Sequence, residues 1–336
     1  MTAQDDAKEE RPPSIRRAAI GWTIGFAVLV AAFATTIGIL NATIYSAHGF
    51  VDTYLDALAR HDATTARELS GVRAPDGTAS DLLTSDAIDA PTHIRLVHDV
   101  AGANGVHTVT YSYRLGSHSE TTDFAVHQTG TSFGLFSQWS FTTSPLATVA
   151  VTVLHDTRFR ANGTDVTSGA KEDAAASYEV FAPGLYSFDH KSTFLVATPV
   201  DVPITDPGSV TPVQVDVQPN PRFVSEVRSQ LDKYFDTCAT QKVLLPTSCP
   251  FGKSFNNRVV STPAWSMTKD PPITIVPASE RGKWLVPNAT GQARLKVKVQ
   301  SLFDGTVSMF DQDVPFQISY SITIGANNHL TISAIE

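Results

Sequence analysis

The hydrophobic pattern begins with an uninterrupted apolar run near the start of the chain. Residues 18–40 contain no charged side chain. A helix of this length rises about 34 Å, which exceeds the roughly 30 Å of a bilayer's hydrocarbon core. Because a helix that is apolar on every side needs an apolar environment, we predict a membrane span over residues 18–45. This segment is the predicted contact with the lipid bilayer.

Charges on either side of the run predict its orientation. Arg16 and Arg17 directly precede it, whereas no basic residue follows before Arg60. By the positive-inside rule, residues 1–17 form a cytoplasmic tail of a single-pass cell-membrane protein, and the later domains are extracytoplasmic. The alternative is a cleaved signal peptide, whose apolar region is shorter, about 7–15 residues, and ends in small residues.

After the span, the pattern changes from a helical period to a period of two. An apolar stripe at helical spacing predicts an amphipathic helix, and its members are Phe50, Val51, Tyr54, Leu55 and Leu58. Alternating runs over 92–100 and 106–115 flank Asn104-Gly105, a strong hairpin signal, and two further strands follow. We therefore predict a helix on a curled four-stranded antiparallel sheet over residues 46–146.

Residues 147–219 show no helical period. Short β-rich runs alternate with turns such as Asn162-Gly163 and Pro183-Gly184. This pattern predicts a small β-sandwich. A module of this size is marginal alone, so we expect it to pack on its neighbours.

The first pattern repeats over residues 220–336. Asn220 is a good helix N-cap and Pro221 suits the first turn. Strands are predicted after this helix, among them separate strands over 283–287 and 293–303. The predicted fold class is α+β, with one N-terminal transmembrane helix followed by two helix-plus-curled-antiparallel-sheet domains that flank a small β-sandwich.

The composition agrees with a folded exterior. The chain is 42% hydrophobic and 17% charged, which is enough apolar material to build a core. Residues 1–17 balance acidic against basic side chains, so the net charge of −8 lies outside. A negative exterior argues against nucleic acid as a partner.

The chain contains two cysteines, Cys238 and Cys249. In an oxidising exterior we expect them to form one structural disulfide. No histidine or further cysteine lies close by in the sequence, whereas a zinc site needs about four ligands. No metal site and no cofactor are predicted.

The layout resembles that of known envelope proteins. A helix followed by a curled antiparallel sheet, directly outside a single span, resembles the nuclear-transport-factor-2-like (cystatin-like) fold of bacterial envelope proteins. The middle segment, with Asn162-Gly163 followed by Pro183-Gly184-Leu185-Tyr186, is similar to PEGA-type β-sandwiches. The whole order resembles the teicoplanin-resistance-associated membrane proteins, which implies a role at the cell wall. Residues 1–17 lack the cysteines of that family's zinc ribbon.

Two short motifs match catalytic signatures without their context. Residues 130–134 spell G-x-S-x-G, but a strand follows them instead of a helix. Residues 168–171 spell S-x-x-K without the companion motifs of penicillin-recognising enzymes. Neither motif predicts an enzyme here.

Three side chains are candidates for ligand binding. Alternation places His98 on the face of Leu96 and His107 on the face of Val109, so both are predicted to face the hollow of the first sheet. There a histidine would bind a ligand or carry protons, although an ordinary strand histidine gives the same pattern. Trp139 is either a stacking platform or a core residue.

These observations support two hypotheses. The first is a non-catalytic, membrane-anchored binding or scaffold protein of the bacterial cell envelope, whose partner is a cell-wall polymer or an envelope protein. The second is a small-ligand sensor or enzyme that uses the hollow of a curled domain. The second hypothesis predicts a deep apolar pocket with His98, His107 or an acid at its floor.

Overall fold

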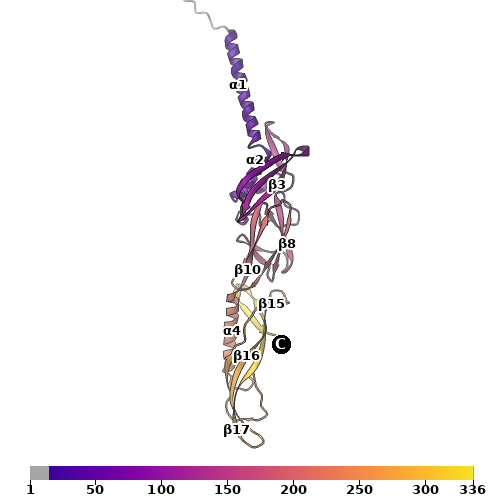
Figure 1. The fold of residues 1–336 in the computed structure, drawn as a ribbon. Helices are drawn as coiled ribbons and strands as arrows, with labels where there is room; N and C mark the ends of the chain where they lie inside the picture. The colour runs from indigo at the N-terminus through magenta and orange to yellow at the C-terminus, as the bar shows by residue number, and fades with distance from the viewer. Residues whose placement is uncertain (1–14, 336) are drawn as a thin grey trace, which may run out of the picture.

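The polypeptide forms an extended molecule, with a single helix at one end and a long β-hairpin at the other (Figure 1). The computed structural model describes residues 15–335, apart from the side chains of residues 15–19 and 103. Residues 1–14 of the predicted cytoplasmic tail lie outside the described residues, as do the side chains of Arg16 and Arg17. The proposed topology signal is therefore not described.

The N-terminal helix α1 (Ile15–Ala42) coincides with the apolar run. Its apolar part, residues 20–42, is long and hydrophobic enough to cross a membrane and is not buried against the rest of the chain. The helix has exposed apolar side chains around its circumference. By length and composition, it is able to span a bilayer as the sequence predicts.

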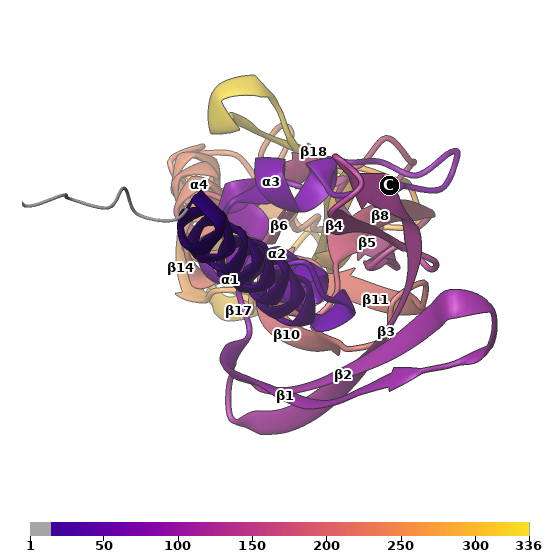
Figure 2. The same cartoon turned by 90° about the horizontal axis from the view of Figure 1, so that it is seen from above.

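The first module packs two short helices against a four-stranded sheet. Ser46 caps α2 (Ala47–Ala59) by accepting a hydrogen bond from the Gly49 N–H, and α3 (Ala63–Glu68) follows. The strands pair in consecutive antiparallel order, and seen from above β1, β2 and β3 curve past α2 (Figure 2). They are β1 (Thr92–Ala101), β2 (Val106–Leu115), β3 (His118–Ser132) and β4 (Phe136–Phe141). The predicted helix and four-stranded meander are confirmed.

The middle module contains two sheets that share a core. One has the order β12-β10-β9-β6-β7, and the other has the order β11-β5-β8 with β11 parallel to β5. The Phe159 ring lies 5.3 Å from the Tyr178 ring, which joins the two sheets across the core. The strands are β5 (Leu146–Leu154), β6 (Arg158–Ala161), β7 (Thr164–Thr167), β8 (Ala175–Phe181), β9 (Gly184–Lys191), β10 (Leu195–Ile204), β11 (Val210–Asp216) and β12 (Gln218–Pro219).

The last module pairs one helix with a six-stranded sheet. Asn220 caps α4 (Pro221–Ala239) by accepting from the Phe223 N–H at 3.0 Å. The apolar stripe of α4 is buried, and the helix packs against β14. The strands are β13 (Arg258–Val259), β14 (Ala264–Lys269), β15 (Val276–Pro277), β16 (Lys283–Gln300), β17 (Val307–Ile324) and β18 (Leu330–Ala334). Three 3-10 turns complete the described elements, namely η1 (Ser85–Ala87), η2 (Ala103–Gly105) and η3 (Ala326–Asn328).

The prediction of separate strands over 283–287 and 293–303 is wrong. Residues 283–300 form the single strand β16, which pairs with β17 along its length, and residues 301–303 lie in the turn that follows. Pro287 lies in a register shift between Val286 and Ala289, and a bulge of this kind accommodates a proline that has no N–H for the ladder. The resulting hairpin extends about 60 Å at 3.3 Å per residue.

The middle and last modules share one hydrophobic core. Phe223 of α4 is fully buried and its ring lies 5.4 Å from Phe194 and 6.0 Å from Trp284. The first module has a separate core under α2. It meets the middle module through Tyr54, whose buried hydroxyl lies 2.9 Å from the Pro145 carbonyl oxygen and 3.0 Å from that of Ala182.

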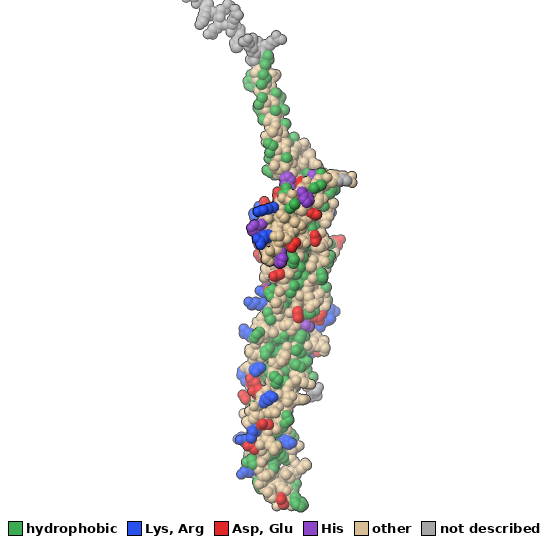
Figure 3. Space-filling view, in the orientation of Figure 1, with side chains coloured by type: hydrophobic (Ala, Val, Ile, Leu, Met, Phe, Trp, Pro, Cys, Tyr) green, Lys and Arg blue, Asp and Glu red, His purple; other side chains and the backbone are tan. Residues whose placement is uncertain are grey.

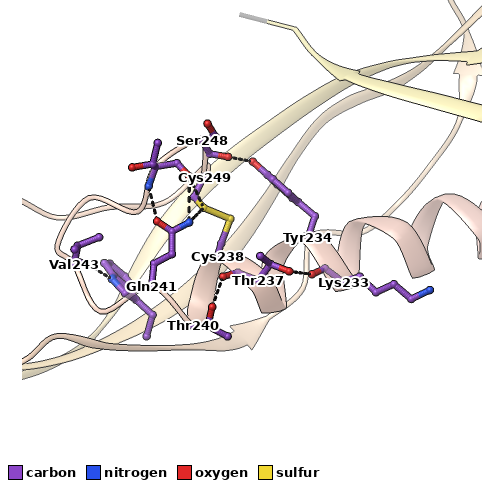
Figure 4. Close-up of a disulfide and its surroundings, with 11 residues drawn as sticks. Lys233, Tyr234, Thr237, Cys238, Thr240, Gln241, Val243, Ser248 and Cys249 are labelled. Carbon is purple, nitrogen blue, oxygen red and sulfur yellow. Dashed lines mark hydrogen bonds between the residues drawn. A yellow bond between two sulfur atoms is a disulfide. The ribbon is translucent and has the colours of Figure 1, made fainter.

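The disulfide between Cys238 and Cys249 joins the end of α4 to the following loop (Figure 4). The Gln241 side chain bridges this loop, since its oxygen accepts from the Thr247 N–H at 2.8 Å and its amide donates to the Thr247 carbonyl at 3.2 Å. Tyr234 donates to the Ser248 carbonyl. The predicted pairing therefore agrees with the structure.

Candidate functional site

The first candidate is a group of histidines and acids where α2 begins. His107 lies on the face of β2 that also carries the buried Val109, as predicted. Its Nδ1 is 2.7 Å from one oxygen of Asp99, and the Nδ1 of His48 is 3.2 Å from the other oxygen. Because a carboxylate only accepts, both rings donate their Nδ1–H to Asp99.

An aromatic and acidic network extends this group. Tyr111 donates its hydroxyl proton to Asp52 at 2.6 Å. Burial, together with that hydrogen bond and the nearby carboxylates, raises the pKa of Tyr111 far above its ordinary value, so the phenol stays protonated. Trp139 lies edge-on to His107, with ring centres 4.9 Å apart, and donates to the Tyr45 carbonyl at 2.8 Å. These contacts attach the start of α2 to three strands.

The predicted position of His98 is wrong. A register shift between Leu96 and His98 adds one residue to β1, so His98 pairs with Thr110 and Asp99 pairs with Val109. One extra residue reverses the alternation of faces along a strand. His98 therefore points away from α2 and its Nε2 lies 2.9 Å from the Thr110 hydroxyl, while Asp99 takes the inward position.

Side chains fill both hollows. In the first module, the Phe124 ring lies 6.1 Å from Tyr54 and 6.4 Å from Tyr111, and all three are buried. In the last module, the Phe316 ring lies 5.7 Å from Phe235 and 5.4 Å from Phe251. In both modules, packed aromatic side chains therefore occupy the space between helix and sheet and have a structural role.

The second candidate is a polar cleft between the middle and last modules. It has a volume of about 440 Å³ and is lined by Asp156, Glu172 and Trp284, among others. The Asp156 carboxylate accepts both guanidinium bonds of Arg158, at 3.1 and 2.8 Å. Glu172 accepts from the Gly282 N–H at 3.0 Å. The acids of this cleft already have protein partners. Because residues from several distant segments, between 155 and 328, line the cleft, no single stretch of sequence indicates it.

The third candidate is the turn that connects β16 and β17 at the far end of the molecule. Leu302 and Phe303 are 72% and 99% exposed there. The space-filling view shows hydrophobic side chains at this end, opposite the apolar surface of α1 (Figure 3). The sequence analysis did not select this turn, although two adjacent large apolar residues beside Asp304-Gly305 are the signal that could have found it.

Within the described residues, no group of three or more His, Cys, Asp or Glu side chains is arranged to hold a metal ion.

Comparison of the chain with protein-family models, with curated proteins and with solved structures finds no match.

Proposed function

We propose that this chain is a non-catalytic, membrane-anchored scaffold or binding protein of the bacterial cell envelope. In this proposal α1 spans the cell membrane with its N-terminus in the cytoplasm, and two cystatin-like modules and a β-sandwich project outside. The envelope setting rests on the resemblance in layout to teicoplanin-resistance-associated membrane proteins. The positive-inside rule supports the orientation.

The observation that carries the proposal is the placement of exposed apolar side chains at both ends of a continuous structure. At one end is α1, and at the other is the Leu302–Phe303 turn. The core shared by the middle and last modules supports a stiff connection to that turn. Such a molecule is suited to holding a partner at a set distance from the membrane.

The filled hollows favour this function over a small-ligand sensor or enzyme. A ligand in either hollow would have to displace buried aromatic rings such as Phe124 or Phe316. Large aromatic side chains contribute much of the stability of a core, so their displacement is costly.

A protein partner suits the distal turn better than a cell-wall polymer. Leu302 and Phe303 supply apolar area, and aromatic anchors of this kind dominate protein interfaces.

The test is photo-crosslinking in intact cells from full-length protein that carries benzoylphenylalanine in place of Phe303. We expect one discrete product, which protease digests and cell-wall hydrolases leave intact. The matched control places the same group at Val210, which is exposed on the side of the middle module, and should give no such product.

Three outcomes discriminate the alternatives. A discrete product from position 303 alone, whose mass cell-wall hydrolases leave unchanged, supports a protein partner. A product that cell-wall hydrolases reduce to the mass of the uncrosslinked protein points to a polymer and contradicts the protein assignment. Equal products from positions 303 and 210, or none, contradict the binding role of the turn.

A further inference from the structure

Three apolar side chains are exposed around the point where α1 ends. Ile44 follows the helix, and Phe133 and Leu135 lie in the turn between β3 and β4. Their exposed fractions are 64%, 92% and 39%. We name these three residues the collar.

Hydrogen bonds fix the β3–β4 turn to the end of α1. The Asn41 side-chain amide donates to the Leu135 carbonyl at 2.7 Å, and its oxygen accepts from the Ser137 N–H at 3.0 Å. The Tyr45 and Phe136 rings add a stacking contact with centres 4.5 Å apart. The turn therefore keeps a constant position relative to the helix.

The turn lies at the depth of the last helical turns. β4 packs against α1. Near the end of this helix Ile37, Leu40 and Asn41 are partly covered, whereas residues 20–36 are exposed. Ile37 is four residues before Asn41, which corresponds to about 6 Å along the helix axis. A turn that covers this face reaches the level where the apolar span ends.

The hairpin around the collar is suited to lipid. Residues 129–141 contain no Asp, Glu, Lys or Arg, so no charge has to leave water when the turn meets the bilayer. Phe133 has a positive φ of 52°, a conformation that an aromatic residue adopts at an energetic cost and that Gly or Asn would adopt more readily. The exposed ring therefore does not serve the stability of the turn.

We propose that the β3–β4 turn inserts Phe133 and Leu135 into the interfacial layer of the outer leaflet. Aromatic and aliphatic side chains are stable at this depth of a membrane. Together with α1, the turn forms a second attachment that sets the tilt of the molecule on the bilayer. The inference rests on the proposed membrane insertion of α1.

The test uses full-length protein in phosphatidylcholine vesicles. The variant Phe133→Cys is labelled with an environment-sensitive nitrobenzoxadiazole dye and mixed with spin-labelled quencher lipids. Because Cys238 and Cys249 are joined in a disulfide, the new cysteine is the labelling site. We expect a blue shift and strong quenching of this dye.

Two matched variants provide the depth scale. Thr129→Cys lies in β3, four residues before Phe133 and about 13 Å away along the strand, so its dye should be quenched less. Phe303→Cys lies at the far end of the molecule and should not be quenched. In Leu135→Cys protein, the additional change Phe133→Asp should abolish quenching of the Leu135 dye.

The outcomes separate this inference from the proposed function. If the protein floats with the vesicles and the Phe133 dye behaves like the Phe303 dye, the insertion is overturned while the anchor stands. If the protein does not float with the vesicles, the anchor and the insertion are both overturned. Graded quenching, strongest at Phe133, supports the insertion.

Discussion

Asp156 is a nearly buried charge, 8% exposed, and all of its hydrogen bonds come from the two residues that follow it. The carboxylate accepts from the Thr157 N–H at 2.7 Å and from the Arg158 N–H at 3.1 Å, in addition to the Arg158 guanidinium. Burial alone would raise the pKa of Asp156, but the hydrogen bonds and charge of Arg158 outweigh burial and lower this pKa below 3.8. The carboxyl group of Asp156 is therefore ionised in the folded protein at neutral pH.

Stability should depend on pH through this residue. A carboxyl group whose pKa is lowered by folding stabilises the protein above its ordinary pKa, and this contribution is lost as the pH falls through the folded pKa. For Asp156→Asn we expect the free energy of unfolding to fall by about 1.5–3 kcal/mol at neutral pH. Between roughly pH 5 and pH 2, the urea midpoint of this variant should decrease less than that of the unchanged protein. The measurement is urea unfolding of the full chain in detergent micelles.

The control is Asp201→Asn, which changes an exposed carboxyl of β10. It should leave both the midpoint and its pH dependence close to those of the unchanged protein. Equal pH dependence in Asp156→Asn and the unchanged protein would contradict the assigned role of Asp156.

In β1, a single extra residue changes which side chain faces α2. Strict alternation predicts His98 inward, and the bulge before it brings Asp99 inward instead. Asp99 then meets His48 and His107, which come from α2 and β2. The pairing partner of a strand decides such a bulge, and periodicity along one strand contains no information about it.

At the scale of elements, the loop after α4 depends on a covalent link. Residues 240–257 contain no helix or strand, and Cys238–Cys249 closes their first half. Trp265 of β14 donates to the Val243 carbonyl at 2.8 Å, so this loop is part of the packing beside the core of the last module. A closed loop of about 12 residues restricts the unfolded chain, which is worth roughly 3 kcal/mol in the chain-entropy model.

Removal of the disulfide should therefore destabilise the last module. For Cys238→Ala combined with Cys249→Ala, we expect the free energy of unfolding to fall by about 3 kcal/mol. Tryptophan fluorescence during urea unfolding measures it, since Trp265 is next to the loop. Addition of a reducing agent should shift the unchanged protein toward the variant and leave the variant unaffected. An unchanged midpoint in the variant would contradict a structural role for the disulfide.

At the scale of the whole molecule, modules are coupled to different degrees. The middle and last modules share one core through Phe223, Phe194 and Trp284. The first module has its own core under α2. It is joined to the middle module at Tyr54 and also through the segment after α3, where Leu82 and Ala87 enter the shared core and Ala79 hydrogen-bonds to β8. We therefore expect residues 147–335 to respond together, and the core under α2 to respond separately from them.

Hydrogen exchange followed by mass spectrometry tests this coupling. Phe223→Ala should cost about 3–5 kcal/mol, as buried aromatic truncations do, and should raise exchange in β9 and in β16 alike. The matched variant Phe124→Ala, in the core of the first module, should raise exchange in β2 and β3 but not in β16. Faster exchange in β16 alone for Phe223→Ala would contradict a shared core.

The hydrophobic pattern by itself determined the local structure and the order of the modules. Uninterrupted apolarity, a helical stripe and a period of two each depend on neighbours along the chain, so the apolar helix, α2, α4 and the first meander follow from them. The N-cap at Asn220 and the cysteine pair are local in the same sense. The sequence pattern alone therefore predicts an α+β protein with several sheets.

Only the tertiary structure decided which elements share a core, where strands shift register and which side chains remain exposed. Phe133 and Phe303 lie beside turn residues, but an apolar residue in a turn can still be buried, because burial depends on what packs over it from distant segments. The same holds for Asp99, whose inward position follows from its pairing with β2. The collar and the distal turn, on which both proposals depend, are products of this long-range packing.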